Sequence, residues 1–380
     1  MNGKSFSYWE QSSFLNNYDV IIIGSGIVGL NAALHLKLER KDLKIAILER
    51  GILPAGASTK NAGFACFGSV SELLSEINTY GEEVVFNLVA KRMKGLQTLR
   101  NNLGDKAISL EKNGGHELFL KDDTVAMETA FEAIIPINNL LKSLADETDI
   151  FSVKNEKIAD FGFSGTQGLI SNSLEAQIDT GKMMLALINK VQSLGVVIFN
   201  QTEVLSFTED YLIRIETKEA VFTTRKIIFA TNAFTSQLFP EIKIKPARGQ
   251  VLVTEPIKGL QVKGTFHYDE GFYYFRDIDQ RILIGGGRNL DFKGEETFDL
   301  EISAIIQQKL EQMLFEVILP SQKVKIEYRW SGIMGFGDTL EPLISKIRTG
   351  LYVAARCNGM GVAIGSLTGM EVAELVLQDM

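Results

Sequence analysis

YDVIIIGSGIVG, residues 18–29, is the stretch that decides the fold of this 380-residue chain. Its apolar run Val20–Ile23, and the later run Ile45–Leu48, are typical of buried strands in a parallel sheet. Between the two runs, Gly24-x-Gly26-x-x-Gly29 stands where a strand turns into a helix. In that position the first glycine permits a tight turn, the second lets the backbone approach a pyrophosphate, and the third allows close helix–strand packing.

Glu49 ends the second strand, 20 residues after Gly29, where a carboxylate can accept hydrogen bonds from ribose hydroxyls. The start of the intervening helix offers free N–H groups and a partial positive charge to phosphates. A glycine fingerprint alone is weak, but here the strand, helix, second strand and acidic residue are all in place. This context predicts dinucleotide binding, and a glycine-rich turn without a ligand is the alternative.

The composition is that of a globular protein, with 45% hydrophobic and 23% charged residues, and the length suggests two or three domains. A net charge of −8 without any basic block argues against a nucleic-acid partner. Cys66 and Cys357 are far apart, and His35, His116 and His267 show no ligand spacing. The sequence therefore predicts neither a disulfide framework nor a metal site.

The compartment is inferred from two further observations. The first 17 residues lack the apolar segment of a secretory signal. No run approaches the roughly 18 apolar residues of a membrane helix. We therefore expect a cytoplasmic protein with no membrane span.

Two later stretches have the character of ligand-binding turns. Residues 51–68 form a long loop with little charge that contains ASTKNAGF at 57–64. Small residues with hydroxyl and amide groups let a backbone approach a ligand, and long loops in compact domains are often functional, although an ordinary surface loop is the alternative. A second glycine-rich turn from strand to helix, NGMGVA, follows at 358–363.

Taken in order, these motifs resemble the FAD-dependent D-amino-acid oxidase superfamily, which includes glycine, sarcosine and γ-glutamylputrescine oxidases. The resemblance covers nearly the whole chain. Ser7-Tyr8-Trp9 and the Ser-x-x-Asn-x-Gly loop are most similar to the γ-glutamylputrescine oxidase branch. The motifs are the glycine fingerprint, STKNAG at 58–63, IFATNA at 228–233, GGG at 285–287, WSG at 330–332 and NGMG at 358–361.

The resemblance implies an α/β (α+β) fold in which a Rossmann-like FAD-binding domain is interleaved with an antiparallel-sheet substrate domain. The strands expected to bind the nucleotide are dispersed along the chain, so neither domain is continuous. Residues 18–68, 150–245 and 325–380 are assigned to the FAD-binding domain, and residues 69–149 and 246–324 to the substrate-binding domain.

The implied cofactor is FAD, with the fingerprint on its pyrophosphate, Glu49 on its adenosine ribose and the second glycine turn on its flavin. Some relatives tether the flavin through a histidine or cysteine, but Asn61 occupies the histidine position and residues 331–342 contain no cysteine. We therefore expect noncovalent FAD. The implied contacts are Gly24, Gly26, Ile27, Val28, Gly29, Glu49, Arg50, Ser58, Thr59, Asn61, Gly63, Val204, Thr231, Asn232, Gly332, Gly359, Met360 and Gly361.

The chain departs from the family at two positions that concern substrate and acceptor. Met334 stands where relatives that use amino acids often have an arginine that clamps the carboxylate. This replacement predicts a preference for amines, or for longer substrates with a distant carboxylate. Leu283 stands where sarcosine oxidases have a lysine that assists oxygen, so either oxygen or another acceptor is possible. The arginines that remain as substitutes for the clamp are Arg276, Arg288, Arg329 and Arg356.

Three residues on one stretch are candidates for catalysis. Tyr273, Tyr274 and His267 lie on strands that the family places over the flavin. The alternative is a half-exposed antiparallel strand, which also favours aromatic residues.

The sequence as a whole predicts a FAD-dependent oxidoreductase that oxidises a C–N bond of an amine or amino acid. A hydride would pass to flavin N5, and the imine product would hydrolyse. The alternatives are a non-catalytic FAD-binding subunit of a larger assembly and a dehydrogenase for D-amino acids or 2-hydroxy acids, because a fold alone does not fix a function. The C-terminal glycine turn disfavours an NAD enzyme.

Overall fold

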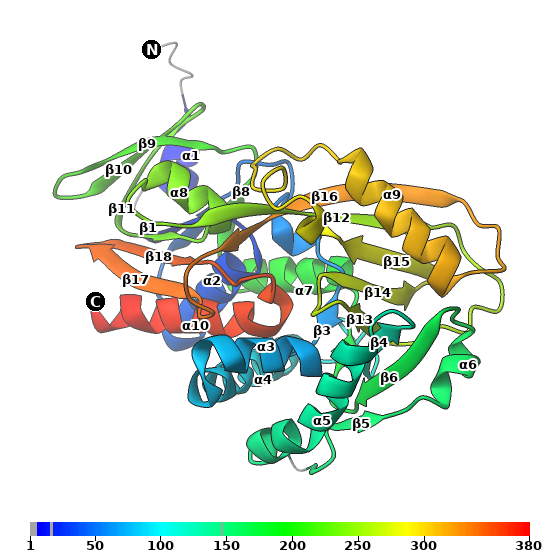
Figure 1. The fold of residues 1–380 in the computed structure, drawn as a ribbon. Helices are drawn as coiled ribbons and strands as arrows, with labels where there is room; N and C mark the ends of the chain where they lie inside the picture. Colours follow the sequence, from blue (N-terminus) through cyan, green and yellow to red (C-terminus); the bar gives the residue numbers. More distant parts are fainter. Residues whose placement is uncertain (1–5, 16–17, 146) are drawn as a thin grey trace.

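The computed structural model describes residues 6–15, 18–145 and 147–380, which form two eight-stranded mixed sheets and one two-stranded ribbon. In Figure 1 the first sheet lies to the left and the second to the right. The ribbon pairs β3 (Phe64–Ala65) with β7 (Ala176–Gln177). This arrangement confirms the α/β class that the sequence predicts.

The first sheet is built around β1 (Tyr18–Ile23), whose residues Val20–Ile22 are fully buried. β1 pairs in parallel with β2 (Ile45–Leu48) and β11 (Val221–Phe229), as expected for strands covered on both faces. The strands further out are β8 (Val197–Phe199), β9 (Val204–Glu209), β10 (Ile213–Thr217), β17 (Leu343–Arg348) and β18 (Leu351–Ala355).

Three helices share a core with one face of this sheet: α2 (Ile27–Glu39), α7 (Thr180–Ser193) and α10 (Gly361–Gln378). Glycines let them approach closely. A Cβ at Gly29 would stand 2.1 Å from the carbonyl oxygen of Gly24, and one at Gly369 would stand 2.6 Å from that of Val28. The third fingerprint glycine therefore has the packing role that the sequence predicts.

The second sheet is mostly antiparallel and is covered on one face by α9 (Ala304–Met313) (Figure 1). Phe266 and Phe275 stack at 4.6 Å within the core beneath that helix. In spatial order its strands are β16 (Ile326–Phe336), β12 (Lys245–Thr254), β15 (Arg281–Gly286), β14 (Tyr273–Ile278), β13 (Thr265–Tyr268), β4 (Gly115–Leu120), β6 (Thr166–Asn172) and β5 (Phe151–Val153).

Strand pairing corrects the predicted domain boundaries in two places. Residues 151–172 and 326–336 were assigned to the FAD-binding domain, but β5, β6 and β16 pair within the second sheet. These strands are short or mixed in polarity, so the sequence does not show which sheet they join. Membership is decided by long-range pairing, such as that of β16 along the whole length of β12.

Three helices share a core with strands β4, β5 and β6 of the second sheet: α3 (Val70–Tyr80), α4 (Glu82–Leu103) and α5 (Thr124–Leu141). α3 begins with a capping box, in which the Ser69 hydroxyl accepts from the Glu72 backbone N–H and the Glu72 carboxylate accepts from that of Ser69. The short elements are α1 (Tyr8–Glu10), η1 (Gln11–Leu15), η2 (Ala57–Thr59), α6 (Lys157–Phe161), η3 (Asn232–Phe234), α8 (Thr235–Leu238), η4 (Arg288–Leu290) and η5 (Leu314–Ile318).

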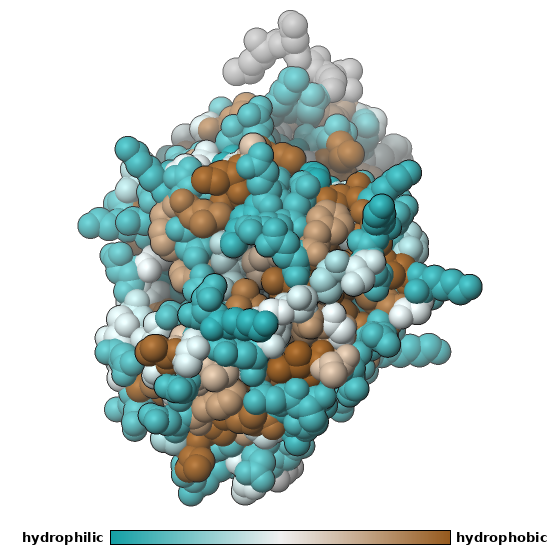
Figure 2. Space-filling view, turned by 45° about the vertical axis from the view of Figure 1, so that its right-hand side comes forward, coloured by the Kyte–Doolittle hydropathy of each residue, from teal (hydrophilic) through white to brown (hydrophobic). Residues whose placement is uncertain are grey.

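The surface carries apolar groups without a broad apolar face on the side drawn in Figure 2. There the hydrophobic side chains form several separate groups bordered by hydrophilic ones. Scattered exposed apolar residues are normal on a protein surface. Among the described residues, no helix combines the length and apolar character that crossing a bilayer requires.

Candidate active site

One cavity of about 640 Å³ is lined by residues of both sheets. We distinguish two parts of its wall. The glycine-lined part comprises residues 24, 26–28, 49–50, 58, 60–63 and 359–361. The aromatic part comprises Phe64, His267, Phe272, Tyr274, Met334 and Phe336, with the charged residues Glu72, Glu76, Arg92 and Arg288.

The first glycine turn lies between β1 and α2, and a Cβ at either of its first two glycines would meet a neighbouring oxygen. Gly24 has a φ of +101°, and a Cβ there would stand 2.8 Å from the Ala230 carbonyl oxygen. A Cβ at Gly26 would stand 2.8 Å from Ser58 Oγ. That hydroxyl accepts a hydrogen bond of 2.9 Å from the Ile27 N–H, so the 58–63 loop is tied to the start of α2.

Glu49 is a buried carboxylate at the end of β2, and it faces the same turn. Its Oε2 accepts from the N–H and hydroxyl of Ser25, at 3.0 and 2.7 Å, and its Oε1 accepts from the Gly51 N–H at 2.9 Å. A carboxylate has about four acceptor positions, so it retains capacity for a further donor. This arrangement fits a nucleotide ribose, whose hydroxyls are donors.

The 58–63 loop is held in place by its own amide. Asn61 Nδ2 donates to the Ser58 carbonyl at 2.9 Å, while its Oδ1 accepts from the Gly63 N–H and the Thr180 hydroxyl, at 2.9 and 2.8 Å. Asn61 therefore shapes the loop, and the loop presents its backbone and small side chains to the cavity.

The second glycine turn precedes α10 and needs left-handed backbone. Asn358 and Gly359 have φ values of 47° and 83°. Asn358 Nδ2 donates to the carbonyls of Thr339 and Leu340, at 2.9 and 2.8 Å, which holds the turn against the neighbouring loop. The first N–H groups of α10 have no acceptor within their own helix, so the turn suits an electron-rich ligand.

Sixteen of the eighteen residues implied to contact FAD line this cavity. The exceptions are Gly29, which packs against the Gly24 carbonyl, and Thr59, whose hydroxyl donates to the Pro54 carbonyl at 2.6 Å. The position of a residue in a motif does not show whether it contacts the cofactor or supports the turn, because residues of both kinds occur at fixed places in the motif. The geometry fits the dinucleotide that the fingerprint predicts.

The three predicted catalytic residues do not share one face of their strands. Tyr274 and His267 line the cavity, and they lie opposite one another on β14 and β13. Tyr273 is only 2% exposed and packs in the core beneath α9. Its prediction as a catalytic residue is wrong, because successive side chains of a strand point to opposite faces.

Glycines make room for the aromatic part. The Tyr274 ring lies over Gly285 of β15, where a Cβ would stand 2.6 Å from the ring. A Cβ at Gly249 would stand 3.0 Å from Met334 Cε and 3.9 Å from the Tyr274 hydroxyl. Tyr274 and Met334 therefore meet over a strand that has no side chain there. Burial raises the pKa of Tyr274 to about 12, so its phenol is neutral at physiological pH.

A charged wall from α3 and α4 was not predicted. Glu72, Glu76 and Arg92 line the cavity, and Arg92 is buried, donating to Glu76 at 3.1 Å and to the Phe67 carbonyl at 2.8 Å. Burial raises the pKa of Glu72 to about 7, and Arg92 opposes the shift. One signal was present: Arg92 lies at helical spacing among the buried residues of α4, where an unpaired charge would be costly.

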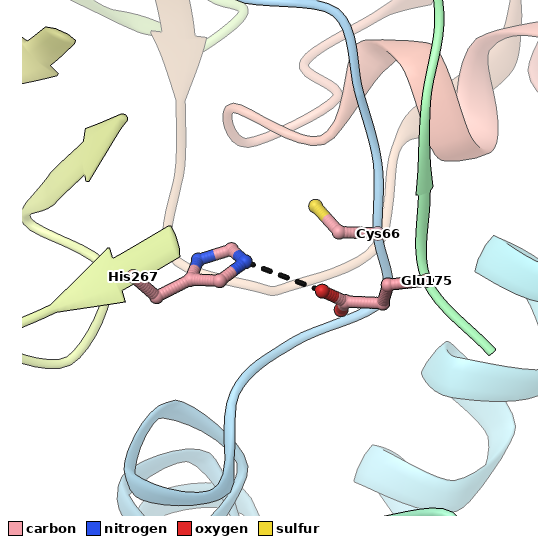
Figure 3. A group of neighbouring side chains, drawn as sticks. All are labelled: Cys66, Glu175 and His267. Carbon is pink, nitrogen blue, oxygen red and sulfur yellow. Dashed lines mark hydrogen bonds and ion pairs between the residues drawn. The ribbon is translucent and has the colours of Figure 1, made fainter. Parts of the chain in front are cut away.

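Three side chains that can ligate metals converge beside this wall (Figure 3). The relevant atoms of Cys66, Glu175 and His267 all lie within 4.8 Å of one another. Both oxygens of Glu175 are already engaged, Oε1 by the Phe67 and Gly68 N–H groups at 3.1 and 3.4 Å, and Oε2 by His267 Nε2 at 3.3 Å. Burial also raises the pKa of the Cys66 thiol, which opposes the thiolate that a metal needs.

His267 instead belongs to a buried ionic network. Burial alone would lower its pKa, but hydrogen bonding to Glu175 and the charges of Glu175, Glu72 and Glu117 outweigh that effect and raise it. The imidazolium therefore persists to higher pH than usual. The imidazole and Phe64 rings meet in a T-shaped arrangement with centroids 5.3 Å apart, so the aromatic part includes a positive charge.

Of the four arginines proposed as substitutes for the missing clamp, only Arg288 lines the cavity. Arg276 donates to the carbonyls of Ala62, Gly63 and Ile178, and Arg329 pairs with Gln307 and Glu311 outside the cavity. Arg356, at a φ of 63°, donates to Thr339 Oγ1 at 2.7 Å and to the Glu341 carbonyl at 3.1 Å, so it braces the loop beside the second glycine turn.

Comparison with known families agrees with this geometry. The family model described as DAO, FAD dependent oxidoreductase, matches residues 19–375. The chain belongs to the DAO family. It is therefore an FAD-dependent oxidoreductase, as the sequence predicts, and FAD is the cofactor that the glycine-lined part fits.

Two curated relatives match at nearly equal identity. Glycine oxidase of Geobacillus kaustophilus is 25% identical, over 95% of this chain and 93% of its own. Gamma-glutamylputrescine oxidoreductase of Escherichia coli is 24% identical, over 95% of this chain and 84% of its own. These values do not separate the branches, so the branch stays a prediction.

The fold also matches a solved structure. The crystal structure of L-proline dehydrogenase from P. horikoshii superimposes with a TM-score of 0.76 at 18% identity, covering 96% of this chain and 94% of that one. At this identity the likeness concerns the fold.

Proposed function

We propose that this flavoprotein oxidises a C–N bond of a small amine or amino acid, whose reacting carbon is held in the aromatic part of the cavity. The observation that carries the proposal is continuity: the glycine turns that fit FAD, and the wall formed by Tyr274, His267 and Met334, line a single cavity. The names of the two curated relatives, a glycine oxidase and a gamma-glutamylputrescine oxidoreductase, support the same substrate class.

FAD held by the glycine-lined part would supply a hydride acceptor for the carbon that bears the nitrogen, and the imine product would hydrolyse in water. The chain must hold that carbon in place, exclude water and bind the amine uncharged. Phe64, Tyr274 and Met334 supply the apolar surface that excludes water.

The proposed reaction also requires a base that takes a proton from the substrate ammonium. Glu72 is the carboxylate best placed to accept it. It lines the aromatic part, its pKa is raised to about 7, and its Oε2 would stand 3.4 Å from a Cβ at Gly271 in the turn above. Glu76 is paired with Arg92, Glu49 belongs to the other part of the cavity, and the remaining carboxylates of the lining, Glu203 and Glu270, are exposed. A base with a pKa near neutrality suits proton transfer at physiological pH.

FAD is proposed to be held without a covalent bond. Asn61 stands where some relatives have a tethering histidine, and its side-chain amide forms hydrogen bonds within the loop. The Cys66 thiol, 4.0 Å from Met360 Sδ, has a raised pKa and is a weak nucleophile. Acid precipitation should release all the flavin to the supernatant, and flavin left in the pellet would contradict this proposal.

The proposed reaction is tested by anaerobic stopped-flow mixing of the FAD-loaded protein with glycine, sarcosine, D-alanine, L-proline, putrescine and γ-glutamylputrescine. Loss of the oxidised flavin absorbance with at least one of them is the expected result. Reoxidation by oxygen or by a quinone analogue then identifies the acceptor class. A flavin that none of these compounds reduces, but that dithionite does reduce, would favour the non-catalytic alternative.

A further inference from the structure

Arg288 is held in an unusual environment at the end of β15. Its guanidinium carbon lies over three phenylalanine rings, 4.3 Å from the centroid of Phe336, 5.1 Å from that of Phe292 and 5.8 Å from that of Phe272. Cation–π contacts of this kind hold the guanidinium among the rings without using its N–H groups as hydrogen-bond donors. The N–H groups point outward from its edge, in the plane, so the edge remains available to a ligand.

The guanidinium has no anionic partner. Within residues 6–15, 18–145 and 147–380, it forms no hydrogen bond or ion pair, and burial alone lowers its pKa. By contrast, Arg92, Arg276, Arg329 and Arg356 all donate to carbonyls, amides, hydroxyls or carboxylates. A half-buried cation without a partner is costly, so it is expected where a ligand supplies the missing anion.

Its position relates it to the missing clamp. A Cβ at Gly359 would stand 3.7 Å from Phe336 Cζ and 3.8 Å from Met334 Sδ, so these two side chains meet over the second glycine turn. Arg288 stacks on the same Phe336 ring. The cation therefore reaches, from η4 just after β15, the neighbourhood of the side chain that replaces the family's arginine on β16.

We propose that Arg288 is the anion-binding residue of the substrate pocket, and that the substrate carries a carboxylate which the edge of the guanidinium binds. This rests on the proposed function, and it narrows the substrate class from amines in general to amines that bear an acid group. Two parallel N–H groups match the two oxygens of a carboxylate.

The carboxylates on the α3 wall of the cavity also fit a substrate that carries both an ammonium and a carboxylate. Glu72 and Glu76 flank the cavity from α3, whereas Arg288 enters from the second sheet. A molecule with an ammonium and a carboxylate would place each charge against its complement. A simple amine would satisfy Glu72 and leave Arg288 unpaired.

The first experiment measures anion binding without requiring turnover. The FAD-loaded protein is titrated with acetate and with propionate, and the shift of the flavin absorbance gives the dissociation constant. Wild type should bind both probes, and Arg288→Met should weaken binding about 30-fold or more, as expected for loss of a buried charge pair. Arg329→Met is the matched control, because Arg329 pairs with Gln307 and Glu311 outside the cavity, and should leave binding unchanged.

The second experiment compares compounds that differ only in the acid group, namely glycine with methylamine and 4-aminobutyrate with butylamine. In wild type the acid-bearing member of each pair should reduce the flavin faster. In Arg288→Met that advantage should disappear, and Arg288→Lys should restore part of it. The FAD content of each variant shows whether the site has remained folded.

The outcomes separate the two proposals. If the acids bind through Arg288 but no amine reduces the flavin, the anion site stands and the proposed reaction fails. If amines reduce the flavin and Arg288→Met changes neither acid binding nor the preference within each pair, the reaction stands and the role of Arg288 is wrong.

Discussion

The two parts of the cavity recognise their ligands by different means. In the glycine-lined part, the glycines let other groups approach the backbone closely, as the Ala230 carbonyl does at Gly24 and the Ser58 hydroxyl does at Gly26. In the aromatic part, the wall consists of side chains from β3, β13, β14, β16, α3, α4 and η4 and from the turn at Phe272. The chain brings them together from more than 250 residues apart, from Phe64 to Phe336. The first part therefore tolerates little change at a few glycines, whereas the second can be altered one contact at a time.

The electrostatics differ in the same way. Glu49 is the carboxylate of the glycine-lined part, and its three hydrogen-bond donors are neighbours in the fold. The aromatic part holds Glu72, Glu76, Arg92 and Arg288, of which only Glu76 and Arg92 pair directly. Charges without internal partners are expected where the ligand changes protonation or supplies the counter-ion. The difference predicts that FAD binding and substrate turnover can be lost separately.

Gly26→Val should have the largest effect, because it closes the backbone approach on which the glycine-lined part depends. Any Cβ there meets Ser58 Oγ at 2.8 Å, and valine adds two methyl groups. We expect FAD affinity to fall on the order of 100-fold or more, since overpacking typically costs 1–3 kcal/mol even without a ligand in the way. The ratio of flavin to protein absorbance after gel filtration measures the loss.

Gly181→Ala is the control for that experiment. It lies in α7 outside the cavity, and its new methyl group meets only the Asp179 carboxylate at 3.3 Å. It should keep full FAD occupancy. A Gly26→Val protein that also kept full occupancy would show that the first glycine turn is not the cofactor site.

The sequence predicted the glycine-lined part well because backbone approach has a residue signature. Where a positive φ or a close contact excludes a Cβ, glycine is nearly obligatory, and its spacing can be read directly. The same argument fails for Thr59, since a hydroxyl next to a turn braces the loop as readily as it contacts a ligand.

The aromatic part was predicted poorly because its residues have no fixed spacing. Tyr273 and Tyr274 are neighbours, and only strand register against Gly286 and Gly285 decides which faces the cavity. The spacing of Glu72 after Ser69 indicates a capping box, and Glu72 has that role in addition to lining the cavity. Arg288 was one of four equivalent candidates until the structure gave the other three their partners.

Glu72→Gln should have the next largest effect, and it acts on turnover while leaving FAD bound. The carboxyl, whose pKa is raised to about 7, accepts a proton only when ionised, so flavin reduction in wild type should increase as pH rises through about 7. Glutamine keeps the size and the acceptor for the Ser69 N–H but cannot take a proton. At pH 8 the rate of flavin reduction should be about 100-fold lower than in wild type, and the increase in rate near pH 7 should disappear.

Glu371→Gln is the matched control for the pH profile. Burial raises the pKa of this carboxyl as well, but it lies on α10 and does not line the cavity. The Glu371→Gln variant should retain both the wild-type rate of flavin reduction and its increase near pH 7. If Glu72→Gln also retains the increase in rate near pH 7, the group that titrates there is not Glu72, and the charged wall only attracts substrate.

The smallest effect is expected from Tyr274→Phe, which tests whether the aromatic part acts through shape alone. The Tyr274 hydroxyl forms no hydrogen bond among the described residues, and its pKa of about 12 keeps it a neutral donor, so it is free to donate to a bound substrate. Losing one such bond costs about 0.5–1.5 kcal/mol, which corresponds to a rate or affinity about 2- to 13-fold lower. The ring itself remains, so the packing over Gly285 is preserved. Tyr273→Phe, on the other face of the same strand, should leave flavin reduction unchanged. Stopped-flow reduction of both variants with one substrate decides between them. An equal loss in the two would mean that the strand, and not the hydroxyl facing the cavity, carries the effect.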